Sequence, residues 1–222
     1  MLKATSISKS YDNGDALLKV LDKVSIDVKS GQIVTIMGQS GVGKTTLLNI
    51  LGTLDTPDEG IVYINGIDVN KCSNKQLSLL RNQEVGFIFQ YHHLISELTV
   101  LENILVPTLI KAYNNDSTIY AEFLIDFIGL KGKQNMYPNQ LSGGERSRVA
   151  TLRAVINKPS IIFADEPTGN LDKINSRLLI KLFIKINKDF NQTIVISTHN
   201  PDVAEIGNKK LVLENGVLRK KK

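Results

Sequence analysis

The sequence predicts an α/β fold in which a parallel sheet is covered by helices and carries two further parts, an antiparallel β subdomain and a helical subdomain. Three observations support this prediction. Short, continuously apolar runs rich in β-branched residues alternate with helical patterns. The first thirty residues instead alternate apolar and polar side chains, and a mostly helical stretch interrupts the succession of apolar runs. Continuous runs are typical of strands buried on both faces, and alternating runs of half-exposed antiparallel strands.

The continuous runs are expected to be strands of the parallel core. They occupy residues 32–37, 85–89, 160–164 and 193–197. Alternation within the first thirty residues, together with the apolar residues 61–64, predicts the antiparallel sheet beside this core.

The helical patterns lie between these runs. They occupy residues 45–54, 75–82, 100–112, 118–128, 145–156 and 176–189. Ser73 with Gln76, and Thr99 with Glu102, match a capping box, which marks the start of a helix. Pro107 has no backbone N–H to donate, so the helix at 100–112 is expected to kink or to divide into two pieces.

Length and composition bound the domain organisation. A chain of 222 residues with 42% hydrophobic side chains suits one large domain and excludes a disordered protein. Within it, we expect residues 91–156 to form a helical lobe, and residues 1–90 and 157–222 to form the α/β core with its β subdomain. The single cysteine, Cys72, excludes an internal disulfide framework and a Cys-based zinc cluster.

Charge and hydropathy limit the partners. No apolar run approaches the roughly 18 residues of a membrane span, and the N-terminus lacks the apolar core of a signal peptide, so we expect a cytoplasmic chain. The net charge is +5, and four of these charges belong to the last four residues. The nearly neutral remainder argues against nucleic-acid binding. We interpret the basic tail, residues 219–222, as a solvated end, with contact to anionic lipid as its functional alternative.

A glycine-rich loop follows the first core strand. Residues 38–45 read Gly-Gln-Ser-Gly-Val-Gly-Lys-Thr, a G-x-x-x-x-G-K-[ST] pattern placed between a strand and a helix. The glycines let backbone N–H groups point at phosphate oxygens, and the following helix adds its positive N-terminal end. Lys44 is expected to reach the β- and γ-phosphates of a nucleotide, and the Thr45 hydroxyl to ligate Mg²⁺.

Polar side chains follow the other three core strands. Gln90 follows the second strand, Asp165 and Glu166 the third, and His199 the fourth. Because ligands bind beyond the carboxyl ends of parallel strands, we expect these residues to converge. Asp165 can hold Mg²⁺ through water, and Glu166 can activate the attacking water. Gln90 can ligate Mg²⁺ or that water, and His199 can hydrogen-bond the γ-phosphate.

A second anion-binding helix end is predicted in the helical lobe. Residues 141–145 read Leu-Ser-Gly-Gly-Glu, in which Ser142 and Glu145 match a capping box and the glycines expose the start of the helix. The chain holds one phosphate loop, so a second anion site far from it suggests that another protomer completes each nucleotide site.

Taken in order, these motifs resemble those of ABC-type ATPases. The glycine-rich loop resembles the Walker A motif, and residues 161–166 resemble the Walker B motif with its catalytic Glu. Gln90 matches the Q-loop, residues 141–145 the signature, Asp172 the D-loop and His199 the H-loop. The resemblance covers essentially the whole chain. It implies a P-loop (RecA-like) parallel sheet core with an antiparallel β subdomain and a helical subdomain.

The resemblance also implies the site residues for ATP and Mg²⁺. Tyr11 stands where the family stacks an aromatic ring on adenine. The residues expected to act in catalysis are Glu166, His199, Gln90 and Lys44. Those expected to bind the nucleotide are Tyr11, Gly38, Gln39, Ser40, Gly41, Val42, Gly43, Lys44, Thr45, Thr46, Ser142, Gly143, Gly144, Glu145 and Asp172. Those expected to hold Mg²⁺ are Thr45, Gln90 and Asp165.

The family's assembly is implied in the same way. Two copies, expected to be a homodimer, hold two ATP molecules head to tail, so that the loop of one chain faces Ser142 and Gly144 of the other. ATP binding closes the dimer, hydrolysis opens it, and the motion drives separate integral membrane permease subunits. The chain is then expected to be peripheral on the cytoplasmic face of the inner or plasma membrane, without a nucleic-acid partner.

Four segments resemble the lipoprotein-release and macrolide-export branch of this family: residues 51–60, 87–94, 97–103 and 167–172. The His-His-Leu after Gln90 favours the lipoprotein-release type. In the family this segment contacts the coupling helices of the membrane subunit, which makes partner-facing candidates of Tyr91, His92, His93, Leu94 and Leu98. A metal site at the two histidines is not favoured, because adjacent side chains diverge and no third ligand is evident.

Two residues depart from the family's usual pattern. Val42 stands where a small residue is common, and Glu145 replaces the commoner Gln of the signature. The Val42 side chain need not face phosphate, and the branch tolerates Glu at this place, so neither departure counts against ATP hydrolysis.

Two other functions are weighed against transport. A regulatory ATPase of the cell-division FtsE type, which signals across a membrane without moving cargo, uses the same motifs and stays open until the membrane partner is known. An ABC-type DNA-repair or ribosome ATPase is not favoured, because such proteins need long coiled-coil insertions, zinc hooks or two tandem cassettes.

Overall fold

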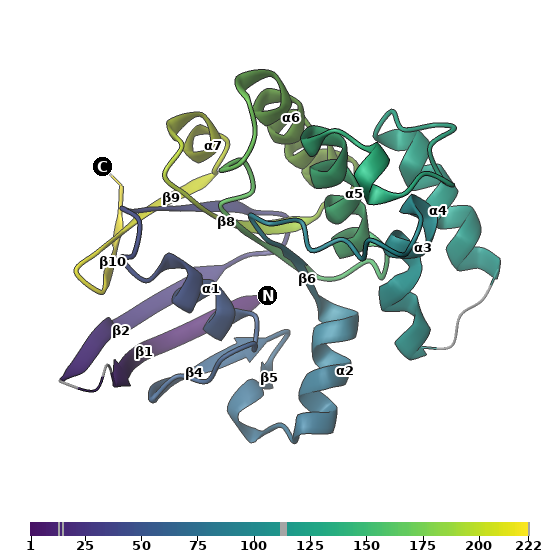
Figure 1. The fold of residues 1–222 in the computed structure, drawn as a ribbon. Helices are drawn as coiled ribbons and strands as arrows, with labels where there is room; N and C mark the ends of the chain where they lie inside the picture. The colour runs from purple at the N-terminus through teal and green to yellow at the C-terminus, as the bar shows by residue number, and fades with distance from the viewer. Residues whose placement is uncertain (13, 15, 112–114, 222) are drawn as a thin grey trace.

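The computed structural model describes residues 1–12, 14, 16–111 and 115–221, which form two sheets and the helices around them (Figure 1). The larger sheet has six strands in the order β10-β9-β3-β8-β7-β6. Their bounds are β3 (Ile33–Met37), β6 (Val85–Ile88), β7 (Ile161–Asp165), β8 (Thr193–Thr198), β9 (Lys209–Glu214) and β10 (Val217–Lys220). The strands from β9 to β6 run parallel, and β10 pairs antiparallel with β9.

The centre of this sheet is apolar on both faces. Every residue of β8 is buried, and Phe163 at the middle of β7 is fully buried. The registers place Ile33 beside Ile194 and Ile161 beside Thr193, so these strands begin at one level and end together at the opposite edge. The four predicted core strands are confirmed to within two residues at each end.

The second sheet is antiparallel, with the order β2-β1-β4-β5. Its strands are β1 (Leu2–Asp12), β2 (Leu17–Val28), β4 (Glu59–Ile64) and β5 (Ile67–Asp68). The alternation expected of a half-exposed sheet is present, because Val24, Ile26 and Val28 are buried while the residues between them are exposed. The mixed architecture that the sequence predicts is therefore confirmed.

Helices cover the larger sheet and form a separate group beside it. They are α1 (Lys44–Leu51), α2 (Asn74–Glu84), α3 (Val100–Leu105), α4 (Asn115–Phe127), α5 (Gly143–Val155), α6 (Lys173–Phe190) and α7 (Pro201–Glu205), with short 3-10 turns η1 (Val69–Lys71), η2 (Val106–Lys111) and η3 (Pro138–Gln140). All three expected capping boxes are present. The predicted break at Pro107 is confirmed, because α3 ends at Leu105 and continues as η2; residue 112 of that prediction lies outside the described residues.

Three apolar clusters hold these layers together. The first joins α1 to the antiparallel sheet and to one face of the parallel strands, and the second joins α6 to the other face. The third lies among α3, α4 and α5, which gather on the side of the molecule away from the antiparallel sheet (Figure 1). The helical group thus has a core of its own, and α5 also packs on α6 and β6.

The carboxyl-terminal ribbon was not anticipated. Lys209–Glu214 and Val217–Lys220 form β9 and β10, joined by a turn in which Asn215 and Gly216 have positive φ angles. The basic tail is therefore partly an exposed edge strand: Arg219 and Lys220 belong to β10, and the Lys221 amide donates to the Lys210 carbonyl at 2.9 Å. Lys222 lies outside the described residues.

Candidate active site

The glycine-rich loop links β3 to α1 at the carboxyl edge of the parallel sheet. Gly41 and Gly43 have φ angles of 78° and 103°, a left-handed conformation that favours glycine, and Gly43 is the N-cap of α1. A Cβ on Gly43 would lie 2.7 Å from Val20 Cγ1, so the loop also needs glycine there for space. Val42 lies close to Gly38, and its side chain packs against the first apolar cluster.

Lys44 lies under this loop and is almost fully buried. Its ammonium donates to the Gly38 carbonyl at 2.8 Å and to the Gln39 carbonyl at 3.0 Å, and it forms an ion pair with Glu166 Oε1 at 3.1 Å. A positive charge and the N-terminus of α1 therefore converge on the curl of the loop. That combination suits an anion of several oxygens, such as a polyphosphate.

Glu166 is placed between two strands' ends in a strained conformation. Its φ is 44°, unusual for a residue with a side chain, and its backbone N–H donates to the Ser197 carbonyl at 3.0 Å. Its Oε2 lies 2.9 Å from His199 Nδ1 and accepts from the His199 backbone N–H at 3.2 Å. Strain of this kind, held by bonds on both sides, is typical of residues kept in place for chemistry.

Asp165 and Thr45 bring two oxygen donors together. The Thr45 hydroxyl donates to Asp165 Oδ2 at 2.7 Å, and the hydroxyl of Ser197 donates to the other oxygen. Hydroxyl and carboxylate oxygens are the donors that Mg²⁺ prefers, so these residues fit the ion that the sequence predicts. Ser197 was not predicted, because a serine inside a buried strand gives no signal until its neighbouring strand is known.

Gln90 takes a different set of contacts from the one expected. Its amide lies against Gly169, and its Nε2 donates to Asn170 Oδ1 at 3.4 Å, while Asn170 Nδ2 donates to the Gln90 carbonyl at 3.3 Å. The residue stands at the end of β6, on the same sheet edge as Asp165 and Glu166, and is bound to the segment that follows them. The structure joins it to this segment rather than to Thr45.

Tyr11 lies at the end of β1 and is fixed by its hydroxyl, which donates to Asp55 Oδ2 at 2.7 Å. Lys9 donates to Asp55 Oδ1 at 3.3 Å and to the Thr56 carbonyl at 2.7 Å, and its ammonium lies 5.3 Å from the centre of the Tyr11 ring. Burial raises the pKa of Tyr11, and the bond to Asp55 raises it further. Tyr11 is 41% exposed, so its side chain is anchored through the hydroxyl and still partly open to solvent.

The signature residues lie at the start of α5, in the helical group. Ser142 is the N-cap, and its hydroxyl accepts from the Glu145 amide at 3.3 Å while Glu145 Oε2 accepts from the Ser142 amide at 2.9 Å. Gly144 is packed so tightly on Asn175 that a Cβ would lie 1.9 Å from Asn175 Oδ1. α1 packs in the cluster with the antiparallel sheet, whereas α5 packs with α6, α3 and α4, to the right of α1 in Figure 1, so the two helices belong to different parts of the chain's fold.

Asp172 is the N-cap of α6 beside this segment. Its two carboxylate oxygens accept from the Asn175 backbone N–H at 2.8 Å and from the Asn175 side chain at 2.7 Å, and these bonds lower its pKa. The structure therefore places Asp172 next to Gly144 through Asn175.

The segment after Gln90 divides into exposed and packed residues. Tyr91 is 68% exposed and His93 is exposed, whereas Leu94 packs against the third apolar cluster. His92 is half-buried, with its Nε2 3.4 Å from the Ser147 hydroxyl, and burial lowers its pKa. Arg153 of α5 donates to the carbonyls of His92 and His93 at 2.8 and 2.6 Å. In the described part of the chain, no group of three or more His, Cys, Asp or Glu side chains could hold a metal.

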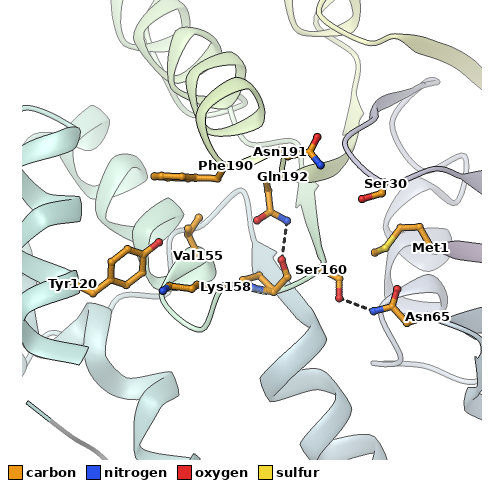
Figure 2. Close-up of a pocket in the computed structure, with 11 residues that line it drawn as sticks. Met1, Ser30, Asn65, Tyr120, Val155, Lys158, Ser160, Phe190, Asn191 and Gln192 are labelled. Atoms are coloured by element: carbon orange, nitrogen blue, oxygen red, sulfur yellow. Dashed lines mark hydrogen bonds between the residues drawn. The ribbon is translucent and has the colours of Figure 1, made fainter. Parts of the chain in front are cut away.

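Two of the cavities along the parallel sheet lie at its opposite ends. One of about 550 Å³ adjoins the glycine-rich loop and is lined by Gly38, Val42 and His199, among others. Another, of about 600 Å³, lies at the amino ends of the strands (Figure 2), where Ser160 accepts from Asn65 Nδ2 at 2.7 Å and Gln192 donates to the Pro159 carbonyl at 3.0 Å. The candidate phosphate-binding and catalytic residues described above lie beside the first cavity, at the carboxyl ends of the strands.

The motifs and their geometry agree with a known family. Residues 21–169 match the family model described as ABC transporter, which is more than half of the chain. The chain belongs to the ABC transporter family. The resemblance read from the motifs is therefore confirmed.

Curated members of the ABC family resemble the chain over nearly its whole length. A lipoprotein-releasing system ATP-binding protein, LolD, of Cytophaga hutchinsonii is 46% identical over 219 residues, covering 98% of each chain. The protein of the same description from Bacteroides fragilis is 42% identical and covers 97% of this chain and 99% of its own.

Solved ABC cassettes share the fold. The dimeric bacterial ABC transporter cassette MJ0796 has a TM-score of 0.91 at 38% identity and covers 100% of this chain and 98% of its own. A dimeric post-hydrolysis state of the same cassette, bound to ADP and Pi, has a TM-score of 0.90 and covers 99% and 98%. The predicted fold class is thus confirmed by independent structures. In the described residues of this ABC protein, no helix is long and apolar enough to cross a membrane.

Proposed function

We propose that this ABC-family chain is the ATP-binding and ATP-hydrolysing subunit of a transporter, and that it powers lipoprotein release by a separate membrane subunit. The observation that carries the proposal is the convergence of Lys44, Glu166 and His199 at the carboxyl edge of the sheet, with Asp165 beside Thr45. Relatives named as ATP-binding proteins of a lipoprotein-releasing system, at 42–46% identity, supply the substrate class and the transport role.

Phosphate binding is assigned to the glycine-rich loop. The backbone amides of residues 38–46 and the Lys44 ammonium would surround the β- and γ-phosphates, since two carbonyls of the loop already hold the ammonium beneath it. Tyr11 presents its ring for the adenine base, on which it stacks.

Hydrolysis is assigned to Glu166 and its neighbours. The Glu166 carboxylate accepts a proton from the attacking water, and His199 orients that carboxylate through Nδ1 and contacts the γ-phosphate with its remaining ring nitrogen. Gln90, on the segment that reaches Asn170, moves toward the phosphate when the subunit closes. Lys44, once bound to phosphate, releases Glu166 for this role.

Mg²⁺ binding is assigned to Thr45 and Asp165, with Gln90 as a further ligand. Bound by these residues, the ion would supply positive charge to offset the negative charge that develops on the transferring phosphate. Ser197 keeps Asp165 turned toward Thr45 through its hydroxyl.

A second copy of this chain is proposed to complete each site. Ser142, Gly143 and Gly144 at the start of α5 would face the γ-phosphate bound by the partner's loop, with Asp172 close by. The whole chain then works as one ATPase domain, with the helical residues 91–156 carrying the signature and the remainder carrying the loop. The dimeric cassettes of similar structure support this arrangement.

The membrane subunit is proposed to bind the segment after Gln90, at the exposed residues Tyr91 and His93. Arg153 ties this segment to α5, so that movement of the signature helix reaches the partner. The chain would then be peripheral on the cytoplasmic face of the membrane.

The test is an affinity purification of tagged Glu166→Gln protein from detergent-solubilised native membranes with ATP, read by mass spectrometry. A permease subunit with a large extracytoplasmic domain, and release of lipoproteins by the reconstituted complex, is the expected result. Tyr91→Ala with His93→Ala should lose the subunit while keeping ATP binding. Recovery of a division-complex membrane protein would favour the regulatory alternative, and recovery of soluble partners alone would contradict the transport proposal.

A further inference from the structure

The signature segment of this chain holds a carboxylate close to the place proposed for phosphate. Glu145 is the third residue of α5. Its Oε2 accepts from the Ser142 backbone N–H at 2.9 Å and from the Ser142 hydroxyl at 3.0 Å. The single hydroxyl proton of Ser142 is therefore directed at Glu145 rather than away from the protein.

A carboxylate at this position opposes phosphate binding. The N-terminus of a helix stabilises one anion, and a second negative charge nearby repels it. A neutral Gln can form the same capping box without this charge. A chain with Glu145 must therefore compensate the charge if the start of α5 is to receive phosphate.

Lys133 supplies the opposite charge. It lies between α4 and η3, and its Nζ donates to Glu145 Oε1, the oxygen that Ser142 leaves free. This bond is the main cause that lowers the pKa of Glu145 to about 2; burial opposes it, and the bonds from Ser142 add to it. The Glu145 side chain is 17% exposed, so the pair is partly sheltered from solvent.

The division of contacts between the two oxygens has a consequence for Ser142. Lys133 satisfies Oε1, and the Ser142 amide satisfies Oε2. The Ser142 hydroxyl can then rotate toward another acceptor without leaving either oxygen of Glu145 unpaired. Its oxygen continues to accept from the Glu145 amide, so the helix cap is kept.

We infer that Lys133 is a positioning residue of the composite site: it neutralises Glu145 and thereby frees the Ser142 hydroxyl and the start of α5 to receive the γ-phosphate of ATP bound to a second copy of the chain. This inference rests on the proposed function. Lys133 acts through Glu145 and Ser142 and does not touch the phosphate.

The test compares ATP-driven dimer formation in a Glu166→Gln background, measured by sedimentation at increasing ATP concentration. Lys133→Met should raise the ATP concentration for half-maximal dimer by about tenfold, with ATP binding to the single chain unchanged. When Glu145→Gln is added to Lys133→Met, the ATP concentration for half-maximal dimer should return to within about twofold of its value in Glu145→Gln alone. No negative charge then remains at residue 145 to be compensated.

Lys131→Met is the matched control. Lys131 lies on the same loop, its side chain is 81% exposed, and it pairs with Asp126 at 3.7 Å. Its substitution therefore removes one positive charge without changing a contact of Glu145. Lys133→Gln is a second variant that removes the charge and keeps a hydrogen-bond donor. Thermal unfolding checks that each variant is folded.

Three results would overturn the inference: no shift in Lys133→Met and Lys133→Gln, an equal shift in Lys131→Met, or a loss that persists when Glu145→Gln is added. Failure of the Glu166→Gln parent itself to form a dimer with ATP is a different result. It would overturn the shared site of the proposed function, and this inference with it.

Discussion

Lys44 and Glu166 form an ion pair across the site, with Nζ and Oε1 3.1 Å apart and side chains that are 6% and 14% exposed. His199 Nδ1 lies 2.9 Å from the other carboxylate oxygen, so Glu166 is held between an ammonium and an imidazole. The pair joins the residue assigned to phosphate binding with the residue assigned to water activation. In the proposed mechanism, a phosphate that attracts Lys44 would therefore also free the carboxylate of Glu166.

Glu166→Gln should separate binding from hydrolysis. The amide keeps the size of the side chain, and its one oxygen can accept from either Lys44 or the His199 amide, but it cannot take a proton from water. ATP turnover should fall by about 10²–10⁴-fold while ATP affinity changes little, as measured by phosphate release and by equilibrium binding. The exposed Glu122→Gln is the matched control, and full turnover by the Glu166 variant would remove this residue from the base role.

Tyr11 should contribute to ATP affinity through its aromatic ring. Asp55 should contribute indirectly, because it accepts the hydrogen bond that positions this ring. Tyr11→Ala should weaken ATP binding by roughly ten- to a hundredfold, the value of stacking one base, with the rate at saturating ATP nearly unchanged. Tyr11→Phe keeps the ring but loses the 2.7 Å bond to Asp55, and Asp55→Asn weakens the same contact. Their effects should be smaller and should not add in the double variant. Additive losses would show that the two residues act independently.

The Lys133–Glu145 pair should make stability depend on pH. The pKa of Glu145 is about 2 in the folded chain, below its usual value of 4.5. A lowered folded pKa stabilises the folded state above the unfolded value, and this stabilisation is lost as pH falls from about 4.5 to about 2. The unfolding free energy of the native chain should therefore exceed that of Glu145→Gln at pH 7, and the difference should disappear toward pH 2. A constant difference would contradict the pair's contribution.

Ser197 should affect the affinity for Mg²⁺ rather than the affinity for ATP. Its hydroxyl donates to Asp165, which accepts from Thr45 at 2.7 Å on its other oxygen. Ser197→Ala should raise the Mg²⁺ concentration for half-maximal hydrolysis by roughly tenfold or more, as loss of such supporting bonds does in other metal sites, without changing ATP binding in the absence of Mg²⁺. Ser160→Ala, at the opposite end of the sheet, is the control. Equal Mg²⁺ curves for the two variants would exclude this role.

The core strands and the residues after them could be predicted from the sequence because their continuous apolar runs are short and rich in β-branched residues, as is typical of buried parallel strands. The carboxyl-terminal ribbon could not. In Lys209–Glu214, which pairs with β3 and β10, only Leu211 and Leu213 are buried and lysines stand at the start, so the strand has no continuous apolar run to mark it.

Within the site, motif spacing predicted the residues but not their partners. Ser197, Asn170 and Lys133 each contact a predicted residue from a distant part of the chain, 32, 80 and 12 positions away. Such contacts depend on strand order and loop path, which periodicity does not contain. Gln90 illustrates the difference, because its place on the sheet edge was predicted and its bonds to Asn170 were not.

The most direct test of the shared site mixes two inactive variants. Lys44→Ala disables the loop of one chain and Ser142→Ala the signature of the other, so a heterodimer keeps one site built from the intact loop of one copy and the intact signature of its partner. Heterodimers purified through two different tags should hydrolyse ATP at about half the rate of the native dimer, while each variant alone stays near background. A heterodimer shown to form that is as inactive as its parents would contradict a site shared between two copies.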